Sequence, residues 1–326
     1  MDSWVWWATF TPLHLMWAGK EAVYVFFILS GFVLALPFVG DSRTTWRAYF
    51  PKRMVRIYLP VWASLIFALL MAWTVPRVAS PDFSSWLNLH EEAPNVLADA
   101  FLLRGAGSLN SPLWSLQWEM LFSLLLPLYV VVALRVRRAW LPGLAGLFLI
   151  IAIGNMKYAA LPVYLPMFGV GVLMASRWDV LERWGRKLGP SGWASLIVAS
   201  MVLLCSQWLF PQLPVTIPLA AIGGALLLFA FIACKSAVKL GNNFLVHWLG
   251  IRSFSLYLVH EPIVVSVAVV LHATNPFQVA LIAMPLSLLV AEIFFRLVER
   301  PSHRLAGVAG RAVTERRRSA EAGMIA

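Results

Sequence analysis

Charged residues are scarce in this chain of 326 residues, where they make up 13% of the positions against 60% for hydrophobic residues. The mean hydropathy is accordingly high, at +0.78. One water-soluble core cannot bury so much apolar surface, so this composition excludes a soluble globular protein. We predict an all-α fold, a polytopic integral membrane helical bundle, because helices satisfy their own backbone hydrogen bonds inside lipid.

Cysteines and acidic residues are also few. Cys205 and Cys234 both lie in apolar runs, which argues against a disulfide framework, and no group of histidines and cysteines has the spacing of metal ligands. The 15 acidic residues are outnumbered by 26 lysines and arginines, for a net charge of +11. These basic residues lie between apolar runs rather than along one amphipathic face, so we expect membrane lipids and not nucleic acid as their partner.

About nine apolar runs are long enough to cross a bilayer about 30 Å thick. They divide the chain into an N-terminal segment over residues 1–21, a membrane domain over 22–300 and a basic cytoplasmic tail over 301–326. The fourth and fifth runs contain several prolines and glycines, which predicts broken or tilted helices. The nine runs cover approximately 22–39, 55–75, 112–134, 139–155, 159–175, 191–210, 215–234, 254–272 and 277–298.

The turns between these runs alternate in charge. Under the positive-inside rule, the basic turns and the C-terminus lie in the cytoplasm, and the long turn over residues 76–111 lies outside, as in a protein of a bacterial-type inner membrane. Nine spans would leave the N-terminus outside, although residues 1–20 contain no element that would export them. One further helix upstream of Met1 would remove this conflict.

Glu119 and His260 are ionisable side chains inside predicted spans, where a charge costs roughly 2.5 to 3.5 kcal/mol. Glu119 lies about 10 Å deep, counted from Pro112 at 1.5 Å per residue. It is either an acid, a base or an orienting carboxylate in a polar cavity, or the structural partner of an arginine or histidine on another helix. His260 is about as deep from the other face, and it either exchanges a proton near neutral pH or serves as an interhelical hydrogen-bond partner.

Arg53 and Arg56 are three residues apart and therefore share one face of a helix at the predicted inner membrane surface. They either anchor the helix end among lipid headgroups or clamp the phosphates of a cytoplasmic cofactor, since planar guanidinium groups bind oxygen anions well. The spacing alone leaves both roles open.

Five short motifs follow one another along nearly the whole chain. In this order and at this spacing, they resemble the acyltransferase 3 family of membrane acyltransferases. The resemblance implies a multispanning enzyme that passes an acyl group, usually acetyl from acetyl-CoA, to a hydroxyl of a sugar in a polysaccharide, glycan, lipid or antibiotic. The motifs are FFILSGFVL at 26–34, RMVRIYLP at 53–60, PLWSLQWE at 112–119, SLYLVHEP at 255–262 and ERP at 299–301.

The resemblance also assigns roles to single residues. It implies that Arg53 and Arg56 serve the acyl donor, that Glu119 is the acidic residue of the third motif, and that acetyl-CoA or another acyl-CoA is a co-substrate, with no permanently bound cofactor. We expect the catalytic base to be His260 or Glu119, in a cavity that Tyr257 also lines. The residues expected to bind the donor are Ser30, Gly31, Phe32, Arg53, Arg56 and Tyr257.

One family motif has no match. The family has an Arg and a His about eleven positions apart on its first membrane helix, and that His is its leading candidate for the base. No such pair precedes Ala22, so we expect this chain to lack the family's first helix.

Two other functions fit the same spans. A transporter or flippase of a lipid-linked sugar would share the broken helices and the intramembrane Glu and His. A truncated family member without catalytic activity would share the motifs. The acceptor, which we expect to be a carbohydrate or glycan, and the oligomeric state are not encoded in a recognisable pattern.

Overall fold

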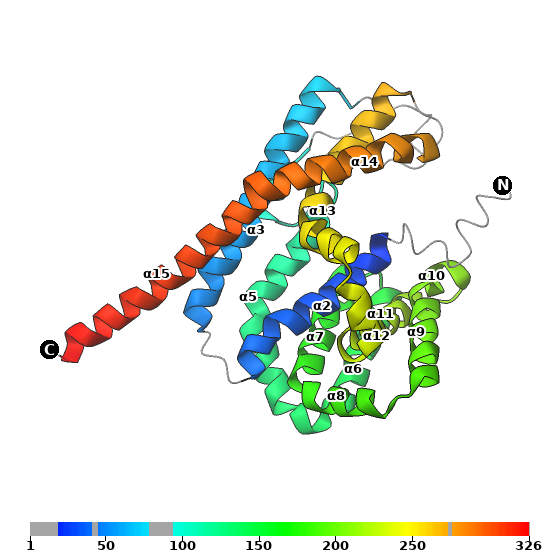
Figure 1. The fold of residues 1–326 in the computed structure, drawn as a ribbon, viewed down its shortest axis with the longest axis vertical. Coiled ribbons are helices and arrows are strands. Elements are labelled where there is room, and N and C mark those ends of the chain that lie inside the picture. Colours follow the sequence, from blue (N-terminus) through cyan, green and yellow to red (C-terminus); the bar gives the residue numbers. More distant parts are fainter. Residues whose placement is uncertain (1–18, 41–44, 78–93, 273–275, 326) are drawn as a thin grey trace. The chain divides into compact units, whose positions relative to one another are not determined.

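The computed structural model describes residues 19–40, 45–77, 94–272 and 276–325, and Figure 1 shows the fold as a ribbon. In these ranges the chain is helical and contains no strand. Seven helices are long and apolar enough to cross a membrane, or eight if one bent pair is a single span. The prediction of an all-helical integral membrane protein is confirmed. The expected first-helix deletion concerns the N-terminal segment, which lies mostly outside the described residues.

The count of about nine spans is not confirmed, although every predicted span falls on a helix. Helix α9, Pro190–Leu204, has only 15 residues. Helix α7, Ala160–Ser176, is followed by α8, Trp178–Lys187, after a bend of 75°. The fourth span was expected to be broken or tilted, and α6, Trp140–Met156, contains no break. Its proline falls in the first helical turn, where a missing backbone N–H has no partner to lose.

The chain forms two compact units, each described by itself. The first unit consists of Met1–Thr44 and Leu124–Val246. In it α2 packs against α7 and α11, α7 packs against α6, and α9 packs against α11. Its helices are α2 (Gly19–Val39), the second half of α5 (Leu113–Arg135), a 3-10 turn (Arg137–Ala139), α6, α7, α8, α9, α10 (Ser206–Leu209), α11 (Thr216–Ala233) and α12 (Lys235–Gly241).

Helices α2 and α7 cross with their backbones in contact. A Cβ atom placed on Gly31 would lie 2.0 Å from the carbonyl oxygen of Phe168, and one on Gly171 would lie 1.9 Å from that of Ile28. The rings of Phe27 and Phe168 stack beside this crossing, with centroids 4.6 Å apart. Small residues allow such approach between helices in lipid, where packing rather than water exclusion drives association.

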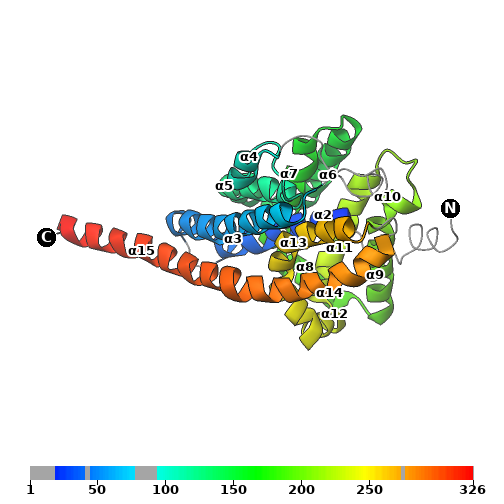
Figure 2. The ribbon, with the colours of Figure 1, turned by 90° about the horizontal axis from the view of Figure 1, so that it is seen from above.

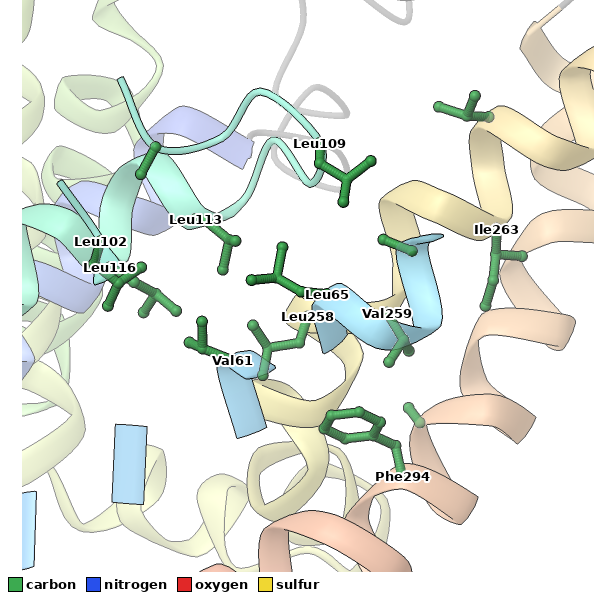
Figure 3. Packing of buried hydrophobic residues seen from close by; sticks show 14 of the residues in the cluster. Val61, Leu65, Leu102, Leu109, Leu113, Leu116, Leu258, Val259, Ile263 and Phe294 are labelled. Carbon is green, nitrogen blue, oxygen red and sulfur yellow. The ribbon is translucent and has the colours of Figure 1, made fainter. Parts of the chain in front are cut away.

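The second unit consists of Thr45–Ser123 and His247–Ala326. Its apolar core joins α3, α5, α13 and α14 (Figure 3). Val61 and Leu65 of α3 meet Leu113 of α5 and Leu258 of α13 there, all at most 4% exposed. Its helices are α3 (Trp46–Thr74), α4 (Val96–Phe101), the first half of α5, α13 (Phe244–Val270), α14 (Pro276–Phe294), a π-helical turn (Phe295–Glu299) and α15 (Arg300–Ile325).

Helix α15, which includes the predicted basic tail, packs along α3 (Figures 1 and 2). Its buried residues Ser302, Ala306 and Gly310 recur every four positions and so form one small-residue stripe. A Cβ on Gly310 would lie 3.5 Å from the carbonyl oxygen of Ala48 and 3.8 Å from Cβ of Lys52. The stripe therefore brings Gly310 close to the start of α3.

Candidate functional site

A buried ion pair joins two of the predicted site residues in the second unit. Arg53 of α3 and Glu119 of α5 are 9% and 4% exposed, and Arg53 Nη2 donates a hydrogen bond to Glu119 Oε1. Arg53 Nε donates to Ser123 Oγ at 3.1 Å, and Ser123 Oγ donates to the backbone carbonyl of Glu119 at 2.7 Å. The structure thus shows Glu119 in the second arrangement expected for it, opposite an arginine of another helix.

Ser123 is not among the site residues predicted from the sequence. Its position four residues after Glu119 places both side chains on one face of α5, which is the signal that could have indicated it.

Arg56, the other predicted donor-binding arginine, differs from Arg53 in its surroundings. Its side chain is exposed, and no described residue forms an ion pair or a hydrogen bond with it. The carboxylates of Glu119 and Glu299 are close enough to attract its charge. Of the two arginines, Arg53 is paired inside the second unit, and a role of Arg56 in donor binding stays a prediction.

Two hydroxyl groups connect α13 with the start of α5. Tyr257 Oη lies 2.7 Å from Ser115 Oγ and donates to the carbonyl oxygen of Pro112 at 3.0 Å. Ser115 is fully buried and belongs to the Trp-Ser-Leu motif, and Tyr257 belongs to the fourth motif. These two motifs are therefore neighbours in space, although 142 positions separate their hydroxyls.

His260 is held in one tautomer by its own helix. Nδ1 lies 3.1 Å from the carbonyl oxygen of Leu256 and 2.9 Å from that of Tyr257. Carbonyl oxygens only accept hydrogen bonds, so Nδ1 carries the proton of the neutral ring and Nε2 keeps a lone pair. Among the described residues none is hydrogen-bonded to Nε2. The arrangement leaves a nitrogen that can accept a proton.

The turn that carries His260 is stabilised from outside the helix. Pro262 has no N–H, so the carbonyl of Leu258 lacks its usual partner four residues on. Asn110 Nδ2 replaces that partner at 2.9 Å, from a fully buried position. Asp99, also fully buried, holds the loop before Asn110 by accepting from three consecutive backbone N–H groups, at 2.6, 3.2 and 2.8 Å. The proline inside the span was the sequence signal that a side chain from elsewhere must bind the carbonyl of Leu258.

We expect Asn110→Leu to lower the free energy of unfolding by about 1 to 3 kcal/mol, because the carbonyl of Leu258 would be left buried and unpaired. The thermal unfolding temperature of the purified protein in detergent would measure this. An unchanged unfolding temperature would show that the hydrogen bond to Leu258 does not stabilise α13.

Ser30, Gly31 and Phe32 belong to the first unit. Gly31 lies at the backbone contact with α7, and the ring of Phe32 meets that of Trp178 edge-on, with centroids 5.9 Å apart. Ser30 is 8% exposed. Packing accounts for the glycine in this motif, and a role of the motif in donor binding stays a prediction.

The family model for an acyltransferase domain, Acyl_transf_3, matches residues 1–296. The chain belongs to the acyltransferase 3 family. It is therefore an acyl-transferring enzyme of the membrane, and the resemblance drawn from the five motifs is confirmed.

Two curated relatives are similar over most of the chain. "Acyltransferase MdmB" of Streptomyces mycarofaciens is 29% identical, over 76% of this chain and 69% of the relative. "Putative peptidoglycan O-acetyltransferase YrhL" of Bacillus subtilis is 24% identical, over 89% of this chain, which spans about half (51%) of that relative. No solved structure matches the chain.

Proposed function

We propose that this acyltransferase moves an acyl group, with acetyl as the first candidate, from acyl-CoA to a hydroxyl of a carbohydrate or glycan. The observation that carries the chemistry is His260, whose Nδ1 is held by its own helix and whose Nε2 is left to accept a proton. The peptidoglycan O-acetyltransferase named among the relatives supports a glycan acceptor. An inactive family member contains no step that needs this proton acceptor, and the family match favours acyl transfer over transport of a lipid-linked sugar.

The residues of the second unit fit an acyl-CoA donor. The phosphates of coenzyme A are anions, and Arg56 is exposed at the predicted cytoplasmic end of α3 with no ion-pair partner in the described part of the chain. The donor supplies an activated thioester, so the protein needs only to bind it, position it and handle protons. Arg53 contributes indirectly in this proposal, because its ion pair with Glu119 sets the position of α3 against α5.

A single base is enough for the transfer step, because the proton that it takes from the acceptor hydroxyl is returned to the leaving thiolate. The acceptor hydroxyl loses its proton to His260 Nε2 as its oxygen attacks the thioester carbonyl carbon. The carbon–sulfur bond then breaks, and the leaving thiolate takes the proton back from His260. Glu119 is the weaker candidate for this base, since its carboxylate is buried and already paired with Arg53.

The test is the rate of CoA release in proteoliposomes supplied with acetyl-CoA and soluble peptidoglycan fragments. We expect His260→Ala to slow acceptor-dependent CoA release by about a hundredfold, the lower end of what a general base contributes. Binding of CoA itself should be unchanged, because the imidazole does not contact the phosphates in this proposal. An unaltered rate in this variant would remove His260 from the mechanism.

The same vesicles separate the rival functions. A transporter would move a labelled glycan across the vesicle membrane without consuming acetyl-CoA. An inactive family member would do neither. Acetyl-CoA consumption that depends on the acceptor is the result that the proposal requires.

A further inference from the structure

Helices α3 and α15 run antiparallel where they touch. Gly310 of α15 contacts Lys52 near the start of α3. Two helical turns earlier on α15, His303 lies close enough to Arg56 for their charges to interact. The contact line therefore runs from Lys52 beside Gly310 to Arg56 beside His303.

Basic side chains line one flank of this contact. Lys52 and Arg56 are one turn apart on α3, and both are exposed. On α15, His303, Gly307 and Arg311 are spaced by four residues and so share the flank next to the buried stripe. We call this flank the α3–α15 basic strip; its charges are those of Lys52, Arg56 and Arg311, and it also contains His303 and Gly307.

Glu299 lies beside this strip and attracts the charge of Arg56, but its carboxylate is buried. Glu299 is 3% exposed and accepts a hydrogen bond from Ser255 Oγ at 2.5 Å, so its carboxylate faces the interior. His303 Nε2 lies 3.7 Å from Glu299 Oε1 and is buried without a hydrogen bond, while 37% of the side chain is exposed. The exposed part of the ring therefore lies away from Glu299.

We propose that the α3–α15 basic strip binds phosphate groups, with α15 as the second wall of a site whose first wall carries Arg56. If the proposed function holds, these are phosphates of the acyl donor. The strip extends about 12 Å along α15, from His303 to Arg311 at 1.5 Å per residue, which suits several phosphates rather than one. The headgroup of an anionic lipid offers the same chemistry, and the experiment separates the two sources.

The experiment measures binding of CoA by calorimetry to the full chain in nanodiscs of zwitterionic lipid. We expect the double variant His303→Ala, Arg311→Ala to bind CoA about tenfold more weakly. The matched control is Arg304→Ala, which removes one exposed charge of the same helix from outside the strip, and it should change affinity less than twofold. Equal CoA affinities in the double variant and the control would contradict the proposal that the strip binds the phosphates of the acyl donor.

A second variant tests the strip without removing any side chain. A Cβ on Gly307 would meet only Arg311 Nη1, at 3.8 Å, so a larger residue fits there. Gly307→Glu places a negative charge in the strip and should weaken CoA binding at least as much as the double variant. Gly307→Gln has the same shape without the charge and should stay within threefold of the parent.

The lipid arm measures retention of phosphatidylglycerol by native mass spectrometry of the same variants. Loss of retained lipid in Gly307→Glu but not in Gly307→Gln, with CoA binding unchanged, would support the phosphate site and assign it to a headgroup. No change in either ligand would overturn the inference. Absence of CoA binding by the parent chain would instead contradict the proposed acyl-CoA donor. The lipid measurement alone would then show whether the strip binds phosphate groups.

Discussion

Glu119→Gln is expected to destabilise the protein by about 3 to 5 kcal/mol, the cost of removing one partner of a buried ion pair. The amide would keep the size of the side chain but leave the charge of Arg53 uncompensated. Arg53 is 9% exposed, and its hydrogen bond to Ser123 Oγ, at 3.1 Å, is to a neutral hydroxyl. We expect a strongly lowered unfolding temperature in detergent together with a loss of activity.

A double variant distinguishes structural from catalytic loss. Replacing both partners, as Arg53→Met with Glu119→Met, removes both buried charges, so the destabilisation should be smaller than the sum of the single changes. The matched control is Glu182→Gln on α8, whose partner Arg186 is four residues away and whose side chain is 49% exposed; it should change stability by less than about 0.5 kcal/mol. Glu119→Gln with normal stability and no activity would return Glu119 to the role of catalytic base.

Gly31→Ala is expected to prevent α2 and α7 from packing. Its new Cβ would lie 2.0 Å from the carbonyl oxygen of Phe168, and backbone atoms cannot move aside as a flexible side chain can. The two helices would have to separate, with loss of the ring contact between Phe27 and Phe168. Overpacking commonly costs 1 to 3 kcal/mol, and a backbone clash should reach about the upper limit or beyond. Gly171→Ala should have a similar effect.

The control for this prediction is a glycine on another helix of the same unit. A Cβ on Gly146 of α6 would meet nothing within 4 Å, so Gly146→Ala should be neutral or stabilise by about 0.5 to 1 kcal/mol through helix propensity. Size-exclusion chromatography in detergent and the unfolding temperature would compare the three variants. A folded, equally stable Gly31→Ala protein would show that the Ser-Gly-Phe motif needs its glycine for something other than packing.

Several features of the site could be read from the sequence because they depend on short-range patterns. The apolar runs predicted the helices, and the order of five motifs predicted the family. The proline at position 262 marked a carbonyl in need of a partner. The partner itself, Asn110, comes from a loop 148 positions away from Leu258, and no local pattern links the two.

The fourth span, which was expected to be broken or tilted, contains no break, and the reason is related. A proline breaks a helix where it removes a backbone hydrogen bond that the helix would otherwise form. A glycine weakens a helix where no neighbouring residue packs against its backbone. Pro142 of α6 lies in the first turn, and Gly154 packs against Pro162. Composition over a window does not distinguish these positions from a true interruption.

The sequence by itself determined that this protein is a helical membrane protein, because the free energy of placing a segment in lipid is a sum over neighbouring residues. It also determined that the protein is an acyltransferase, because each family motif is a short run of neighbouring residues. Only the tertiary structure decided what each functional side chain does. Arg53 and Arg56 are equivalent in the sequence, yet one is neutralised by Glu119 and the other is exposed. That difference depends on which face of α3 meets α5, and helix packing sets it through contacts between residues far apart in the chain.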